Sequence, residues 1–129
     1  RSAFSCRGGV KDKKGGPNST GKERFVFLGF ENAAEPGKMN LFAREGSNKW
    51  GAKTLVAENL DLKKWYRIAI EANVPEGFYE VSVDGGPAFE LESFFTRGRT
   101  PSKLSHISFA SWNDGPGTFY VDNVSVSGD

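Results

Sequence analysis

Three stretches of the sequence alternate aromatic, cationic and polar side chains with apolar ones, so that a strand would turn the polar set away from its core. A sugar site needs flat aromatic surfaces for the apolar faces of pyranose rings, and planar polar groups for the hydroxyls. These outward positions supply both, and a tryptophan in the loop-like stretch 48–51 adds another aromatic surface. The alternative is structural, because aromatic side chains also pack under loops or between sheets. The candidate ligand-binding residues are Arg44, Trp50, Arg67, His106 and Trp112.

The arginines in this set favour an acidic partner. A guanidinium group binds carboxylates and sulfates through planar, charge-assisted hydrogen bonds. A second cationic cluster lies at Arg97, Arg99 and Lys103, where a solvated turn is the simpler explanation. The predicted partner is therefore a polysaccharide or glycan, with acidic glycans favoured over neutral ones.

Catalytic chemistry has weaker support in the sequence. A pair of carboxyl groups that cleaves a glycosidic bond lies about 5–10 Å apart. Glu90 and Glu92 meet that spacing at a hairpin end, but solvated edge charges explain them better. There is no nucleophile elbow, phosphate-binding glycine loop or histidine pair for zinc. We assign no catalytic residue to the chain by itself, and membership of a larger polysaccharide lyase or glycoside hydrolase stays open.

Composition sets the class of protein. The chain has 129 residues, enough for one domain with a single core. Its formal net charge of +1 gives no argument for binding nucleic acid or a membrane, and no stretch approaches the roughly 20 apolar residues of a membrane span. Eleven phenylalanines with 16 glycines are typical of aromatic strands punctuated by turns. Cys6 is alone, which excludes an intrachain disulfide and a cysteine-based metal site.

Hydrophobic alternation predicts an all-β fold. The predicted strands are 24–30, 39–44, 53–57, 65–72, 79–83, 88–91, 104–112 and 118–127. Asp84-Gly85-Gly86-Pro87 is a strong hairpin signal between two of them. Their spacing predicts a two-sheet antiparallel β-sandwich as a single domain, 1–129. Residues 1–23 are expected to be largely loop, so N-terminal strands of a larger domain could be missing. The predicted core is Phe25, Phe27, Tyr66, Ile68, Ile70, Val81, Ile107, Phe109 and Val124.

The closing stretch changes its apolar phase in the middle. Phe119 and Val121 share one face of an extended chain, whereas Val124 and Val126 share the other. A strand can do this by burying both faces in turn or by a bulge. Asp122 would then share a face with apolar residues, where an unpaired carboxylate is costly. We therefore expect Asp122 to be buried and to bind hydrogen-bond donors or a cation.

The stretch Gly117-Thr-Phe-Tyr-Val-Asp-Asn-Val-Ser-Val126 resembles the segment that closes many concanavalin A-like (laminin G-like) jelly-roll domains and related carbohydrate-binding modules. The stretches Asp61-Leu-Lys-Lys-Trp-Tyr-Arg-Ile-Ala-Ile70 and Tyr79-Glu-Val-Ser-Val-Asp-Gly-Gly86 resemble the middle of the same domains. The resemblance covers roughly residues 55 to 128.

This resemblance implies a concanavalin A-like jelly roll that serves as a non-catalytic carbohydrate-binding or adhesion module of a larger secreted protein, extracellular or periplasmic. It also implies a structural calcium at Asp122, with a hydrogen-bonded aspartate as the alternative. Two other functions stay open: an accessory structural domain that packs against a neighbouring domain or chain, and a fragment of a polysaccharide-degrading enzyme.

Overall fold

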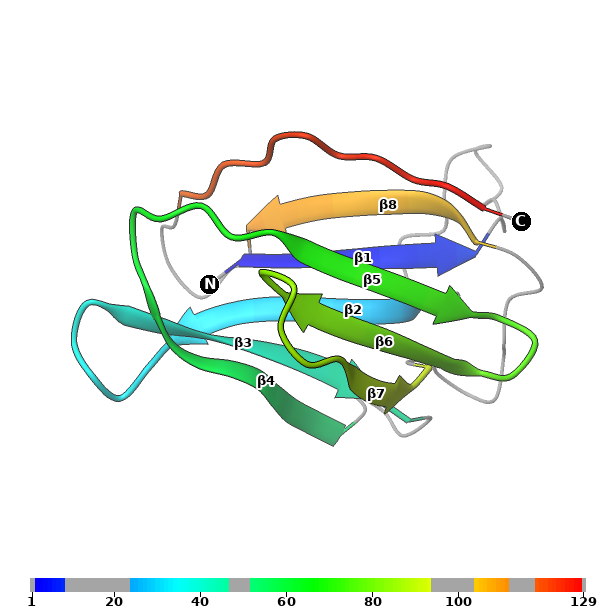
Figure 1. Ribbon diagram of the computed structural model, residues 1–129, viewed down its shortest axis with the longest axis horizontal. Coiled ribbons are helices and arrows are strands. Elements are labelled where there is room, and N and C mark those ends of the chain that lie inside the picture. Colours follow the sequence, from blue (N-terminus) through cyan, green and yellow to red (C-terminus); the bar gives the residue numbers. More distant parts are fainter. Residues whose placement is uncertain (1, 9–23, 47–51, 94–103, 112–117, 129) are drawn as a thin grey trace.

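The computed structural model describes residues 2–8, 24–46, 52–93, 104–111 and 118–128. Every regular element within these ranges is a strand, which confirms the all-β prediction (Figure 1). No helix able to cross a membrane is found in the described ranges. The strands are β1 (Ser2–Gly8), β2 (Arg24–Asn32), β3 (Lys38–Glu45), β4 (Ala52–Asp61), β5 (Ile68–Asn73), β6 (Phe78–Val83), β7 (Phe89–Glu92) and β8 (Leu104–Ser111).

These strands form two antiparallel sheets that face each other (Figure 1). The large sheet has the order β4-β3-β2-β1-β8, and the small sheet has the order β5-β6-β7. One hydrophobic cluster draws on both sheets, as expected of a two-sheet sandwich. Its buried members are Phe25, Val26, Leu28, Leu41, Ala43, Val56, Tyr79, Val81 and Leu91.

The β6–β7 hairpin forms where the sequence predicts it. Asp84 and Gly85 both have positive φ, 51° and 72°, and the Gly86 N–H donates to the Val83 carbonyl at 3.0 Å. Two consecutive positive φ values closed by such a bond are the geometry of a type I′ turn, which favours an Asp-Gly pair. Asp84 also bonds the backbone of Arg67 in both directions, each at 2.8 Å, so this turn fixes the chain entering β5.

The two sheets are tied together at the end of β3. The Tyr79 hydroxyl on β6 donates to the Arg44 carbonyl on β3 at 2.7 Å. The Glu45 carboxylate accepts from the Thr54 hydroxyl on β4 at 2.9 Å and from the Glu92 N–H on β7 at 2.8 Å. The backbones of the two sheets approach most closely where β3 faces β7 and β4 faces β6. The sandwich is therefore closed on its β3–β4 side.

Strand β1 was not predicted. It pairs with β2 on one side and β8 on the other, so it lies inside the large sheet. Its sequence, Ser-Ala-Phe-Ser-Cys-Arg-Gly, has few large apolar side chains, so hydrophobic alternation gave no strand signal there. The rest of the predicted N-terminal loop, 9–23, lies outside the described residues. Strand β4 is longer than predicted, with register shifts against β3.

The predicted core is only partly correct. Phe25 and Val81 are buried in the core, Phe27 is buried on the outer face beside Arg44, and Tyr66, Ile68 and Ile70 are half-buried. The prediction is wrong for Ile107 and Phe109, which are 38% and 37% exposed, and for Val124, which is 51% exposed.

Position in the sheets explains the two errors on β8. Ile107 and Phe109 are in register, through β1, with Val26 and Leu28 of the core, so they lie on the inner face. The small sheet has three strands and the large sheet has five, so the β8 end of the large sheet is less covered.

The expected final strand is also wrong. Residues 118–128 are extended but form no strand, and they run along the upper edge of the molecule beyond β8 (Figure 1). Asn123 has φ +52°, and its N–H donates to Asp122 Oδ1 at 2.8 Å. Asp122 is exposed, not buried. The phase change of the sequence therefore marks a kink, where a local side-chain hydrogen bond replaces a sheet ladder.

Candidate functional site

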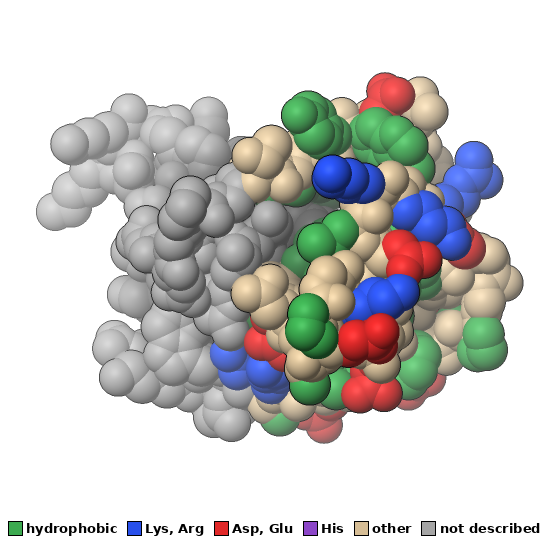
Figure 2. All heavy atoms as spheres, turned by 90° about the vertical axis from the view of Figure 1, so that its left-hand side faces the viewer, with side chains coloured by type: hydrophobic (Ala, Val, Ile, Leu, Met, Phe, Trp, Pro, Cys, Tyr) green, Lys and Arg blue, Asp and Glu red, His purple; other side chains and the backbone are tan. Residues whose placement is uncertain are grey.

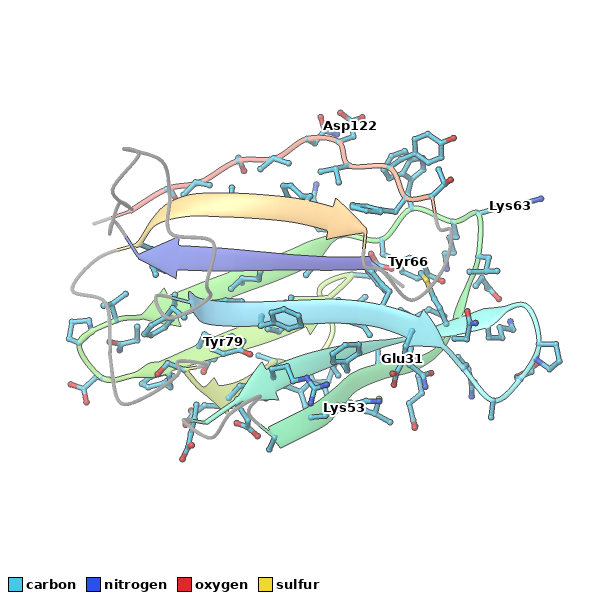
Figure 3. All side chains as sticks on the ribbon, turned by 180° about the vertical axis from the view of Figure 1, so that it is seen from behind. Glu31, Lys53, Lys63, Tyr66, Tyr79 and Asp122 are labelled. Carbon is cyan, nitrogen blue, oxygen red and sulfur yellow. The ribbon has the colours of Figure 1, made fainter. Side chains whose placement is uncertain are left out.

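The outer face of the large sheet, opposite the core, carries a cluster of aromatic and charged residues. Backbone register places Phe27 beside Arg44 and Gly29 beside Phe42 across β2 and β3. Across β3 and β4 it places Arg44 beside Lys53. Residues that are directly paired share a sheet face, so these side chains lie together. Figure 3 views the large sheet from this side and labels Glu31 and Lys53.

Phe42 lies over a glycine at the centre of this cluster. A Cβ added at Gly29 would be only 2.4 Å from Cζ of Phe42, so the ring occupies the space that another side chain would take. The Phe27 and Phe42 ring centroids are 6.4 Å apart with an interplanar angle of 36°. Phe42 is fully buried although it faces away from the small sheet. The ring is therefore a support for neighbouring groups rather than an open stacking surface.

Two cations lie over this one ring. The guanidinium carbon of Arg44 is 5.5 Å from the Phe42 centroid, and Nζ of Lys53 is 5.2 Å from it. Lys53 is neutralised by Glu31, whose carboxylate oxygens are 2.6 and 2.7 Å from Nζ. Arg44 has no such partner in the described part of the chain, and its Nε is buried without a hydrogen bond.

Arg44 is half-buried, and its guanidinium is a flat cation with an unpaired Nε, held against the buried ring of Phe42. A buried donor without an acceptor is unfavourable, and arginine forms its strongest hydrogen bonds with planar anions. This arrangement can bind a carboxylate, a sulfate ester or vicinal hydroxyls.

Of the predicted site residues, the structure places Arg44 and Arg67 on different sheets. Arg44 lies on β3, whereas Arg67 precedes β5 of the other sheet. His106 belongs to β8, where its backbone pairs with Arg7, and two strands separate β8 from β3. Trp50 and Trp112 lie outside the described residues, as does the cationic stretch 97–103.

Sequence reasoning missed Gly29, Glu31 and Lys53 as members of this site. Gly29 interrupts an otherwise aromatic and apolar strand, and an isolated glycine in a strand often marks the close approach of another group. That signal was available. The Lys53–Glu31 pair could not be predicted from the sequence, because it depends on β3 lying between β2 and β4.

A second exposed aromatic lies in the β4–β5 loop. Trp65 is 65% exposed, in line with the outward position expected for it, and Leu62 of the same loop is 51% exposed. The loop is fixed by Tyr66, whose hydroxyl accepts from the Asp61 N–H at 2.7 Å. Cationic and acidic side chains are interspersed with hydrophobic ones over this end of the molecule (Figure 2).

An ion pair joins this loop to the start of β3. Nζ of Lys38 hydrogen-bonds Oδ1 of Asp61. That hydrogen bond, and then the charge of Asp61, raise the pKa of Lys38 above its ordinary value. The same hydrogen bond and the charge of Lys38 lower the pKa of Asp61. The pair is on the surface, so it orients the loop more than it stabilises the fold.

The outer face of the small sheet is acidic. Glu71, Glu80 and Glu90 are directly paired across β5, β6 and β7, and they form a row of three carboxylates. Like charges opposite one another in a sheet are destabilising. Glu90, which spacing had placed at a hairpin end beside Glu92, therefore has Glu80 as its nearest acidic neighbour across the strands.

The described residues around Asp122 do not fit a calcium ion. Calcium takes six to eight oxygen ligands. Asp122 is exposed, and in the described ranges no three histidine, cysteine, aspartate or glutamate residues come together as a metal site. Calcium binding at Asp122 therefore stays a prediction from the sequence resemblance.

Comparison with known proteins yields no relative for this chain: no family model, curated protein or solved structure matches it.

Proposed function

We propose that the chain is a concanavalin A-like jelly-roll module that binds carbohydrate without catalysis, as part of a larger secreted protein in an extracellular or periplasmic setting. The sequence resemblance over residues 55–128 supports the fold family and the setting. The two-sheet architecture is compatible with it.

The observation that carries the binding proposal is the Arg44 guanidinium, which lies against Phe42 and whose Nε has no hydrogen-bond partner in the described residues. The proposed site is the β2–β3–β4 outer face, with Lys53 adding a second cation. Arg67 is not part of it, because Arg67 directly precedes β5 of the small sheet. Among the described side chains of this face, the two cations Arg44 and Lys53 outnumber the single acid Glu31, which leaves an excess of positive charge. The proposed ligand class is therefore an acidic glycan that carries carboxylate or sulfate groups.

A glycan array probed with the full chain tests this proposal. Retention on sulfated or uronate-containing glycans, weaker at high salt, is the expected pattern, because exposed charges are screened over about 8–10 Å. Retention that is equal on neutral and acidic glycans would contradict the acidic site. No retention on any glycan would favour an accessory structural domain that packs against a neighbour.

The glutamate row on the small sheet favours one other candidate, a fragment of a polysaccharide-degrading enzyme. Adjacent strands bring paired Cβ atoms to about 5 Å, so Glu80 and Glu90 are close enough for a two-carboxylate mechanism. An assay for new reducing ends on plain and acidic polysaccharides separates the two functions. Turnover that disappears in Glu80→Gln and in Glu90→Gln would replace the binding proposal by this one.

A further inference from the structure

On the side of the sandwich opposite the β3–β4 closure, no described strand covers the gap between the two sheets. β5 is the outermost strand of the small sheet, and among the described strands it pairs with β6 alone. Its inner residues Ile68 and Ile70 are half-buried. On β8, at the corresponding end of the large sheet, Ile107 and Phe109 face inward yet remain 38% and 37% exposed. One more strand beside β5 would cover all four side chains.

The closing segment, residues 118–128, has the properties of such a strand. It is extended, and it exposes Tyr120 (79%), Val121 (44%), Val124 (51%) and Val126 (81%) without pairing to any described strand. Its eleven residues span up to roughly 36 Å when extended, against about 20 Å for the six residues of β5.

The kink at Asn123 allows both halves of the segment to pack their apolar side chains on the same surface. Apolar residues change phase at Asp122 and Asn123, so a regular strand would turn Val121 and Val124 to opposite faces. A residue in the left-handed region, such as Asn123 with φ +52°, is a feature of bulges that insert one extra residue. A bulge there turns both apolar halves toward one face.

We infer that the closing segment of one copy pairs with the β5 edge of a second copy, which gives a strand-exchanged dimer. A second copy is the indicated partner because each chain has both the unpaired segment and the uncovered edge, and a twofold arrangement satisfies both at once. In its own copy the segment lies outside every described ladder (Figure 1). The inference rests on these apolar surfaces and is independent of the proposed glycan site.

Sedimentation equilibrium of the full chain from low to high micromolar concentration tests the inference. A reductant is included because Cys6 could otherwise link two chains. The wild type is expected to dimerise. Two variants should each weaken the dimer at least about tenfold. The donor variant, Val124→Lys/Val126→Lys, changes the segment that one copy donates. The acceptor variant, Ile107→Lys, changes the inner surface that the donated segment would cover. Leu55→Lys is the matched control, because Leu55 is also 38% exposed but lies on β4, at the other edge of the large sheet, and it should change the dimer less than about twofold.

Mixing the two weakened variants is the most specific step. The donor variant keeps an intact β5 edge and the acceptor variant keeps an intact segment, so together they should form a heterodimer with one exchanged strand. Circular dichroism and melting of each variant alone establish that it is folded. A wild type that is monomeric throughout, a dimer that tolerates both variants, or one equally weakened by Leu55→Lys would overturn the inference. Failure of the mixture to associate would also do so.

Discussion

Gly29 is the position where a single added carbon atom should disturb the proposed site most directly. In Gly29→Ala the new Cβ would lie 2.4 Å from Cζ and 2.8 Å from Cε1 of Phe42, about 1 Å inside ordinary contact. The ring cannot withdraw easily, because Phe42 is fully buried and lies beside Phe27, Arg44 and Lys53. The backbone itself accepts alanine, since Gly29 is not among the glycines with positive φ.

The size of the effect follows from two opposing terms. Overpacking a closely packed site costs about 1–3 kcal/mol. Replacing glycine by alanine at a permitted conformation restores about 0.4–1 kcal/mol, because the unfolded chain loses freedom. Taking the middle of each range, the net loss of stability should be about 1.3 kcal/mol, which corresponds to a melting temperature lower by roughly 4–7 °C for a domain of this size.

Thermal and urea unfolding of Gly29→Ala, Gly128→Ala, Phe42→Leu and the double variant Gly29→Ala/Phe42→Leu measure this loss of stability. Gly128→Ala is the control, because nothing lies within 4 Å of its added Cβ, and it should be neutral or slightly stabilising. In a Phe42→Leu background, Gly29→Ala should cost less than about 0.5 kcal/mol, since the clash is gone. A Gly29→Ala protein as stable as the wild type, or the same cost in both backgrounds, would refute the contact on which the site is built.

Three further predictions concern single side chains. Tyr79→Phe leaves the Arg44 carbonyl without its 2.7 Å donor between the sheets, and urea unfolding should show a loss of about 1–3 kcal/mol; no loss would mean that this tie is dispensable. Because Lys38 lowers the pKa of Asp61, the ion pair stabilises the fold above the unfolded pKa of about 4, and this stabilisation is lost as pH falls through the folded pKa. The melting temperature of Asp61→Asn should therefore depend less steeply on pH below ~4 than that of the wild type. Equal pH dependence of the two proteins would contradict this prediction. Asp122→Ala should leave the melting temperature unchanged, with or without chelator, because Asp122 is exposed; a drop that chelator reproduces in the wild type would restore the calcium hypothesis.

The small sheet also allows a test of charge repulsion. Glu80 lies between Glu71 and Glu90 in register, so Glu80→Gln should stabilise the fold by about 0.2–1 kcal/mol at low salt. The gain should shrink as salt is added. Destabilisation by this change would indicate that the row binds a cation or a partner.

The strands that sequence predicted well are those whose side chains alternate around large apolar residues. The β6–β7 hairpin is the clearest case, because an Asp-Gly turn and its flanking alternation agree locally. Strand β1 was missed because its place in the sheet comes from pairing with β2 and β8, which no local pattern carries. The closing strand was predicted wrongly for the opposite reason: its residues have strand chemistry, but they pair with none of the described strands.

The sequence predicted the type of candidate site, a cationic and aromatic sheet face, but only some of its residues. Arg44 was identified because alternation puts it opposite the core side chains of β3. Alternation alone does not say which sheet a strand joins, so Arg67 was grouped with Arg44 although it belongs to the other sheet. Lys53 and Glu31 became part of the site only through strand order.

Titration calorimetry with a sulfated oligosaccharide tests the central claim most directly. We predict weak binding by the wild type, with Kd roughly 0.01–1 mM. Arg44→Gln should weaken it at least about tenfold, and Arg44→Lys by less, because it keeps the charge but loses the planar fork. Arg67→Gln removes a cation next to the small sheet, away from the proposed site, and should leave Kd within about twofold of the wild-type value. Binding that survives Arg44→Gln unchanged, or that is lost equally in Arg67→Gln, would contradict a glycan site on the β2–β3–β4 face.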